Sequence, residues 1–269
     1  MKRAVISSFL FTLLFVGIAS ASYISLTTTI SDITIEDIVQ TNVKLMNSGD
    51  EAAFNLHVSL LLPDGFKSDE ISVARLDANA SFEKNISITR IKEISPGRYP
   101  IVVMTEYTDA NGYLLSAISH TSLIYKTSTT SKVTGSISEL ALEGKSIKKL
   151  EVTLRNLDDT THEVKVELFL PRELKTANSE KTFLLVTKEE KNVEFDVSNL
   201  AALEGSSYVI LASLEYEDRL HYSSFASGII KIEKKEEIFS LNNLILVLTG
   251  IIILFIYYEA RRILKRKSK

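Results

Sequence analysis

An internal repeat constrains the fold of this chain more than any other feature. Short segments of the first half recur in the second half, in the same order and at an offset of 107 to 109 residues. A period this long exceeds a solenoid unit, so it predicts two tandem domains of about 100 residues each. The matching pairs are 43–47 with 152–156, 60–63 with 168–171, 83–86 with 190–193, Tyr99 with Tyr208, 106–107 with 215–216, and Tyr113 with Tyr222.

Within each copy the local pattern is that of β-strands. Apolar residues alternate with polar ones at Val43 and Leu45, over 54–60, and again over 164–168. Period-2 alternation indicates strands with one buried face. Turn residues separate these runs, as at 63–65, where the sequence is Pro-Asp-Gly. The pattern predicts an all-β fold of two tandem Ig-like antiparallel β-sandwiches, followed by one C-terminal transmembrane α-helix.

Tyr99 and Tyr208 each follow a turn and open a late strand. This position is typical of the tyrosine corner of Ig-like sandwiches, where the hydroxyl bonds nearby backbone and the ring fills one end of the core. We therefore expect structural roles for both tyrosines. The alternative is an exposed aromatic residue that contacts a ligand.

Both ends of the chain carry targeting signals. Residues 1–21 have a basic start, an apolar stretch and Ala-Ser-Ala, the layout of a cleavable signal peptide, with an uncleaved N-terminal anchor helix as the alternative. Residues 238–258 are an uncharged, largely apolar run long enough to cross a bilayer. The tail, 259–269, is basic, which predicts a cytoplasmic C-terminus and an external N-terminal ectodomain. Its topology residues are Arg261, Arg262, Lys265, Arg266 and Lys267.

The predicted domains are a first sandwich over 22–127 and a second over 128–237. A short polar linker at 127–131 joins them, so we expect the sandwiches to lie end to end. Only 234–237 separate the last strand from the predicted membrane helix. This arrangement would hold the second sandwich near the headgroups and the first one farther out.

Charge and cysteine content limit the possible functions. Residues 22–237 contain 23 basic and 33 acidic residues, and an acidic ectodomain argues against nucleic acid as a partner. The chain has no cysteine, which excludes a disulfide-stapled scaffold and thiolate chemistry.

The sequence shows no catalytic, cofactor or metal motif, and it predicts a protein that is not an enzyme. Asp158 and Asp159 fit a turn, and Glu106 and Glu215 recur at matching positions, which favours structural roles. The four histidines, which we expect to be ordinary surface residues, are His57, His120, His162 and His221.

Three asparagines have possible roles outside the core. Asn79 and Asn85 open glycosylation sequons, and Asn79 is favoured because it lies in a predicted loop. Asn243 could hydrogen-bond to a partner helix in the membrane or lie at headgroup level.

These patterns resemble the CARDB-type Ig-like domains of prokaryotic, archaeal more than bacterial, membrane-anchored surface proteins. The resemblance rests on the Asn turn, the Leu-Leu-Leu-Pro strand end, the Glu-Lys-Asn strand and the Pro-Gly-x-Tyr strand start, and it covers roughly 25–127 and 133–235. The second copy departs from it at 203–206 and at 158–159.

The resemblance implies an adhesion, scaffolding or accessory role at the cell envelope. We therefore expect a non-enzymatic recognition or scaffold protein with no cofactor. Its partner would be an envelope or membrane protein or a surface glycan. The alternative is an accessory subunit of a membrane transporter or export complex.

Overall fold

The computed structural model describes residues 23–234 and ten helical residues between 245 and 261. The described chain is mostly β-structure. Within the described residues, no helix combines the length and apolar character that crossing a membrane requires. The predicted signal peptide lies outside the described residues, as do most of the predicted span 238–258 and, except for Arg261, the basic tail.

Eighteen strands make up the described β-structure, and they fall into two sets of nine. The first set is β1 (Leu26–Ile30), β2 (Ile33–Ile35), β3 (Ile38–Asn47), β4 (Ala53–Leu61), β5 (Phe66–Ser68), β6 (Ile71–Leu76), β7 (Ser81–Arg90), β8 (Gly97–Thr108) and β9 (Leu114–Tyr125). The second set is β10 (Val133–Ile137), β11 (Leu140–Glu143), β12 (Ile147–Asn156), β13 (His162–Phe169), β14 (Leu174–Thr176), β15 (Glu180–Leu185), β16 (Glu190–Asn199), β17 (Ser207–Glu217) and β18 (His221–Glu233).

Each set folds into a sandwich with the same strand order. In the first, the sheet β1-β3-β7-β5 packs on a sheet formed by β6, β4, β8, β9 and β2. In the second, β10-β12-β16-β14 packs on β15, β13, β17, β18 and β11. Every strand of the first sandwich therefore has its counterpart nine places later, so the sequence repeat is also a repeat of structure.

The core of each sandwich follows the alternation of the sequence. Val43 and Leu45 of β3 are 0% and 1% exposed, and they pack on residues of β4 and β8. The alternation is interrupted in β4, where the register shifts between Phe54 and His57 and Asn55 has a φ of 51°. This bulge places Ala53 and Leu56 in the core, so the expected burial pattern of 54–60 is only partly correct.

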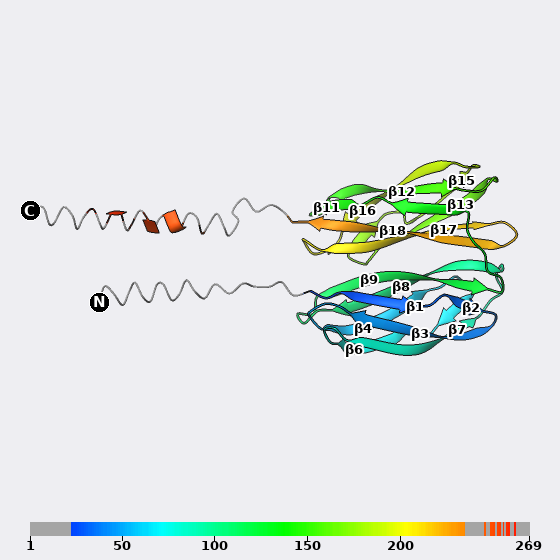
Figure 1. Cartoon of the computed structure of the whole chain (residues 1–269), viewed down its shortest axis with the longest axis horizontal. Helices are drawn as coiled ribbons and strands as arrows, with labels where there is room; N and C mark the ends of the chain where they lie inside the picture. Colours follow the sequence, from blue (N-terminus) through cyan, green and yellow to red (C-terminus); the bar gives the residue numbers. More distant parts are fainter. Residues whose placement is uncertain are drawn as a thin grey trace, which may run out of the picture.

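The sandwiches lie side by side, and the expected end-to-end arrangement is wrong (Figure 1). The outer face of β8 and β9 packs on the outer face of β17 and β18. The centre of this contact is a small cluster in which Val102, Ile118 and Leu211 are at most 7% exposed. A single parallel pairing, Gly97 with His221, also joins β8 to β18, which links the two sheets into one.

The two copies contact each other through equivalent faces. Val102 and Leu211 occupy matching positions, since Tyr99 corresponds to Tyr208 in the repeat. Ile118 and Phe225 also match. Tyr107 pairs with Leu115, and Ile118 lies three residues after Leu115. In the second copy Tyr216 pairs with Tyr222, and Phe225 lies three residues after Tyr222. Each copy thus presents the same surface to the other, as subunits of a twofold dimer do.

The described β-structure begins and ends at one end of this double sandwich. Tyr23 and Lys234 line the same hollow, together with the β8–β9 turn at Asp109. We call this the terminal end. The linker between the copies and the β17–β18 turn lie at the opposite end (Figure 1).

Candidate functional site

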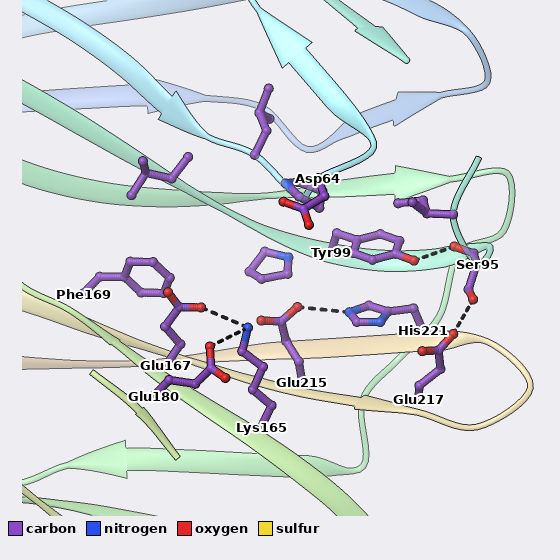
Figure 2. Close-up of a pocket in the computed structure, with 15 residues that line it drawn as sticks. Asp64, Ser95, Tyr99, Lys165, Glu167, Phe169, Glu180, Glu215, Glu217 and His221 are labelled. Atoms are coloured by element: carbon purple, nitrogen blue, oxygen red, sulfur yellow. Dashed lines mark hydrogen bonds and ion pairs between the residues drawn. The ribbon is translucent and has the colours of Figure 1, made fainter. Parts of the chain in front are cut away.

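A cleft of about 710 Å³ opens between the sandwiches, on the side away from the terminal end (Figure 2). Both copies contribute to it, so it exists only because they pack side by side. Its apolar lining comes mainly from the first sandwich and its charged lining mainly from the second. The lining residues are Leu61, Leu62, Pro63, Asp64, Ile94, Ser95, Tyr99, Pro100, Lys165, Glu167, Phe169, Glu180, Glu215, Glu217 and His221.

At the equivalent region of the terminal end, the loop after β13 contacts the first sandwich. There Arg172 pairs with Glu106 across the two sandwiches at 2.8 Å. The next residue, Glu173, is 1% exposed and accepts hydrogen bonds from the Ser116 backbone at 2.6 Å and from its hydroxyl at 2.5 Å. These contacts bind the copies tightly at that end.

The loop after β4 has the same turn but different side chains. Pro63 accepts a hydrogen bond from the Phe66 backbone at 3.0 Å, as Pro171 does from Leu174. At the position of Arg172, however, this loop carries Asp64, and at the position of Glu173 it carries a glycine. Asp64 cannot neutralise Glu215, which is the counterpart of Glu106. The two ends therefore differ in charge, because an arginine faces Glu106 at one end and an aspartate lies at the matching place at the other.

The cleft is strongly acidic. Five carboxylates line it, from Asp64, Glu167, Glu180, Glu215 and Glu217. Lys165 is the one lysine or arginine in its lining, and it already contacts Glu167 at 3.3 Å and Glu180 at 3.0 Å. Glu215 is the cross-strand neighbour of the same lysine, while Asp64 and Glu217 have no lysine or arginine beside them in this lining. With five carboxylates and one lysine, the potential in the cleft favours a cation.

His221 and Tyr99 form the inner end of the cleft. Nε2 of His221 lies 3.1 Å from Oε2 of Glu215, and Ser213 donates a hydrogen bond to the other oxygen at 3.1 Å. Ser95 donates a hydrogen bond to Glu217 across the sandwiches. Burial raises the pKa of the Tyr99 hydroxyl above its ordinary value of 10.0, and the nearby Glu217 and Glu215 raise it further. Tyr99 is therefore neutral at physiological pH.

This set of side chains can bind a cationic group. Carboxylates with apolar walls can hold an ammonium or guanidinium group together with its aliphatic stem. Among residues 23–234 and the described helical residues, no group of three histidine or carboxylate side chains is arranged to hold a metal ion.

The two tyrosines predicted to form corners are buried, Tyr99 at 6% and Tyr208 at 7% exposed. The Tyr99 hydroxyl donates a hydrogen bond to the Ser95 carbonyl at 2.6 Å, and the Leu203 backbone N–H donates one to Tyr208 at 3.2 Å. Both hydroxyls thus bond to backbone of the turn that precedes their strand. Tyr99 also lies at the cleft, which its sequence position did not indicate.

The two sequon asparagines are on the first sandwich, away from the cleft lining. Asn79 is exposed in the turn between β6 and β7 and has a φ of 57°. Asn85 is exposed in the middle of β7 and accepts a hydrogen bond from the Asn42 amide at 3.1 Å. Of the predicted topology residues, only Arg261 belongs to the described chain, and the other four lie outside it.

The histidines differ in their surroundings. The expectation of ordinary surface histidines is wrong for His162, which is 8% exposed and lies 3.0 Å from Asp158. The backbone N–H of Asp159 and then His162 lower the pKa of Asp158. His221 is half-buried in the cleft, whereas His120 stacks on Phe225 beside the inter-sandwich cluster.

Comparison with known proteins identifies no family. No protein-family model matches the chain, and no curated protein matches it in sequence. The fold class that the structure defines is a mostly β protein of two packed sandwiches.

Solved structures resemble the chain only loosely. A protein of unknown function from Porphyromonas gingivalis W83 is 15% identical, with 76% of this chain and 98% of that one covered and a TM-score of 0.30. The YadV chaperone is 12% identical, with 75% and 98% covered and a TM-score of 0.29. Escherichia coli alpha-2-macroglobulin is 11% identical, with 78% of this chain but 17% of that one covered and a TM-score of 0.32.

Proposed function

We propose that this chain is a non-enzymatic recognition or scaffold protein of the cell envelope, held outside the membrane by a C-terminal helix. In this proposal the sandwiches are Ig-like domains of the CARDB type, 238–258 is the anchor and 1–21 is a signal peptide. The observation that carries the proposed recognition is the acidic cleft between the two copies.

The partner is a protein segment that presents a lysine or arginine next to apolar residues. Three carboxylates of the cleft face a space that contains no arginine, whereas at the other end an arginine occupies the matching place. Exposed Leu61 and half-buried Phe169 provide apolar walls for the stem of such a side chain. Charge attraction would mainly speed association, while the apolar contact would contribute to affinity.

The position of the cleft supports this role. Tyr23 and Lys234 lie at the terminal end, away from the cleft. If the chain continues from Lys234 into a membrane anchor, the cleft faces away from the bilayer. Both sandwiches then stand at similar distances from the membrane, and a partner outside the cell reaches the cleft without crossing the anchored end.

Replacing Asp64 by arginine tests the proposal. The new side chain occupies the place of Arg172, so it should pair with Glu215 as Arg172 pairs with Glu106 and put a positive charge where the partner's cation would bind. Crosslinking in cells, followed by mass spectrometry, should recover a partner with the natural chain and lose it with Asp64→Arg. The matched control is Asp196→Arg, on the exposed outer face of β16, which should retain the partner.

A partner that is captured equally by Asp64→Arg would overturn the role of the cleft. If that partner is also a stoichiometric membrane protein, the result would favour the accessory-subunit alternative. In that case the contacts lie in the membrane helix or elsewhere on the sandwiches.

A further inference from the structure

The terminal end carries a cluster of exposed apolar side chains from both sandwiches. Tyr113 and Leu114, at the β8–β9 turn, are 48% and 41% exposed, and Leu200, after β16, is 61% exposed. All three line one shallow hollow beside Arg172. We call these three residues the terminal patch. Apolar groups that gather on a surface in this way usually mark a contact with another molecule or with a membrane.

The patch is specific to this end of the molecule. The β8–β9 turn has five residues between its strands, whereas the equivalent β17–β18 turn has three. In the shorter turn, the residues that match Tyr113 and Leu114 are Leu220 and His221, and both are half-buried. Because the β8–β9 turn is two residues longer, Tyr113 and Leu114 are exposed, whereas their counterparts in the second copy are half-buried.

The turn presents its side chains in a fixed geometry. The carboxylate of Asp109 accepts hydrogen bonds from the backbone N–H groups of Asn111 at 2.9 Å and Tyr113 at 2.7 Å. Gly112 has a φ of 80°, a conformation that glycine adopts without strain. The exposure of Tyr113 is therefore a property of an ordered turn, and little conformational entropy is lost when it meets a surface.

The path of the chain indicates which surface the patch meets. Lys234 and Tyr23 line the hollow next to the patch, where Leu203 is also exposed. Three residues separate Lys234 from the apolar run that starts at Ile238. A link of this length spans at most about 14 Å. If 238–258 crosses the bilayer, the terminal end must lie within about that distance of the hydrocarbon region.

We infer that the terminal patch rests in the headgroup layer of the membrane and holds the double sandwich with its cleft outward. This inference rests on the anchoring part of the proposed function. Tyrosine is suited to the interface because its ring is apolar and its hydroxyl can hydrogen-bond to water and headgroups. The patch itself contains no basic residue, so the contact is with the lipid interface in general and does not need anionic lipid.

Single-cysteine labelling tests the inference, because the chain contains no cysteine of its own. The full chain with Leu114→Cys or Leu200→Cys is labelled with an environment-sensitive fluorophore and placed in phosphatidylcholine vesicles. The matched controls are Ile91→Cys and Leu157→Cys, which are 58% and 48% exposed near the opposite end. Lipids with a spin label at the headgroup should quench the first pair and leave the controls bright.

Flotation of the vesicles separates the possible failures. If the chain does not float with the vesicles, the anchoring part of the proposed function is wrong and this inference falls with it. If it floats, but all four probes are quenched equally or the controls are quenched more, only the inference is overturned. Circular dichroism with the β-sheet signal of the natural chain shows that each variant is folded.

Discussion

The ring of Tyr99 in the first sandwich stacks on the ring of His221 in the second, with centroids 3.9 Å apart and planes 6° from parallel. The Tyr99 hydroxyl is fixed by the Ser95 carbonyl, and Nε2 of His221 lies 3.1 Å from Glu215. Tyr99, a core residue of the first sandwich, thus contacts His221, which lies beside the acidic residue Glu215 of the second sandwich. The packing of the two copies and the shape of the cleft therefore depend on the same contacts.

Gly97→Ala should separate the sandwiches at this junction. Gly97 has a φ of 152°, which residues with a side chain rarely adopt, and an added Cβ would lie 2.2 Å from the carbonyl oxygen of His221. The backbone pairing of Gly97 with His221 cannot accommodate this atom. We expect a larger radius of gyration in small-angle X-ray scattering, while the β-sheet signal is retained.

Gly112→Ala is the control for this substitution. Gly112 also has a positive φ, of 80°, but an added Cβ meets nothing within 4 Å. It should lower stability by about 1 kcal/mol through backbone strain alone and leave the shape of the molecule unchanged. Equal shapes for the two variants would show that the Gly97 pairing does not hold the sandwiches together.

Glu173→Ala should weaken the contact at the terminal end. Its carboxylate is buried and accepts two hydrogen bonds from Ser116. Alanine leaves the buried backbone N–H of Ser116 without its acceptor, which costs about 1–3 kcal/mol. The melting temperature should fall clearly for alanine and less for Glu173→Gln, which keeps one acceptor. Similar melting temperatures for both variants and the natural chain would contradict the role of this contact.

Stability should depend on pH through His120. His120 is exposed overall, but desolvation where its ring stacks on Phe225 lowers its pKa below the ordinary value of 6.5, and Asp32 opposes this shift only in part. The unfolded chain then takes up the proton at a higher pH than the folded chain. The contribution of His120 is full above about 6.5 and is lost as the pH falls through its folded pKa.

His120→Gln should therefore lose less stability on acidification than the natural chain does. Melting temperatures of both proteins across this pH range give the comparison, and the other three histidines act equally in both. If the two curves stay parallel below pH 6.5, His120 does not titrate with folding.

Much of each sandwich could be predicted from the sequence, because alternation reports one buried face. The packing between sandwiches was missed, although a signal for it was present. Residues 101–104 and 209–212 are continuous apolar runs, which indicate strands covered on both faces. Val102 and Leu211 are the buried members of these runs that face the other copy, and Met104 packs beside them.

One repeat match proved to be misplaced. Tyr113 is exposed in a turn, whereas Tyr222 stacks on Tyr216 with centroids 4.9 Å apart. The second turn is two residues shorter than the first, so the offset between equivalent residues falls by two after it. Identical residue types at an unchanged offset therefore occupy different structural positions. The cleft could have been anticipated only by asking where the copies differ in charge, as Asp64 and Arg172 do.

The repeated asparagine at the end of β3 and β12 provides a last prediction. Asn47 and Asn156 are 0% and 1% exposed. Each amide donates hydrogen bonds to three backbone carbonyls, and each side-chain oxygen accepts one from the backbone two residues later. Asn47→Ala should remove all of these hydrogen bonds, including the buried one to the Leu76 carbonyl, at a total cost of about 1–3 kcal/mol. Calorimetry should show a clearly lower melting temperature, while Asn42→Ala, exposed on the same strand, should change little; equal effects would mean that the buried amide network does not stabilise the fold.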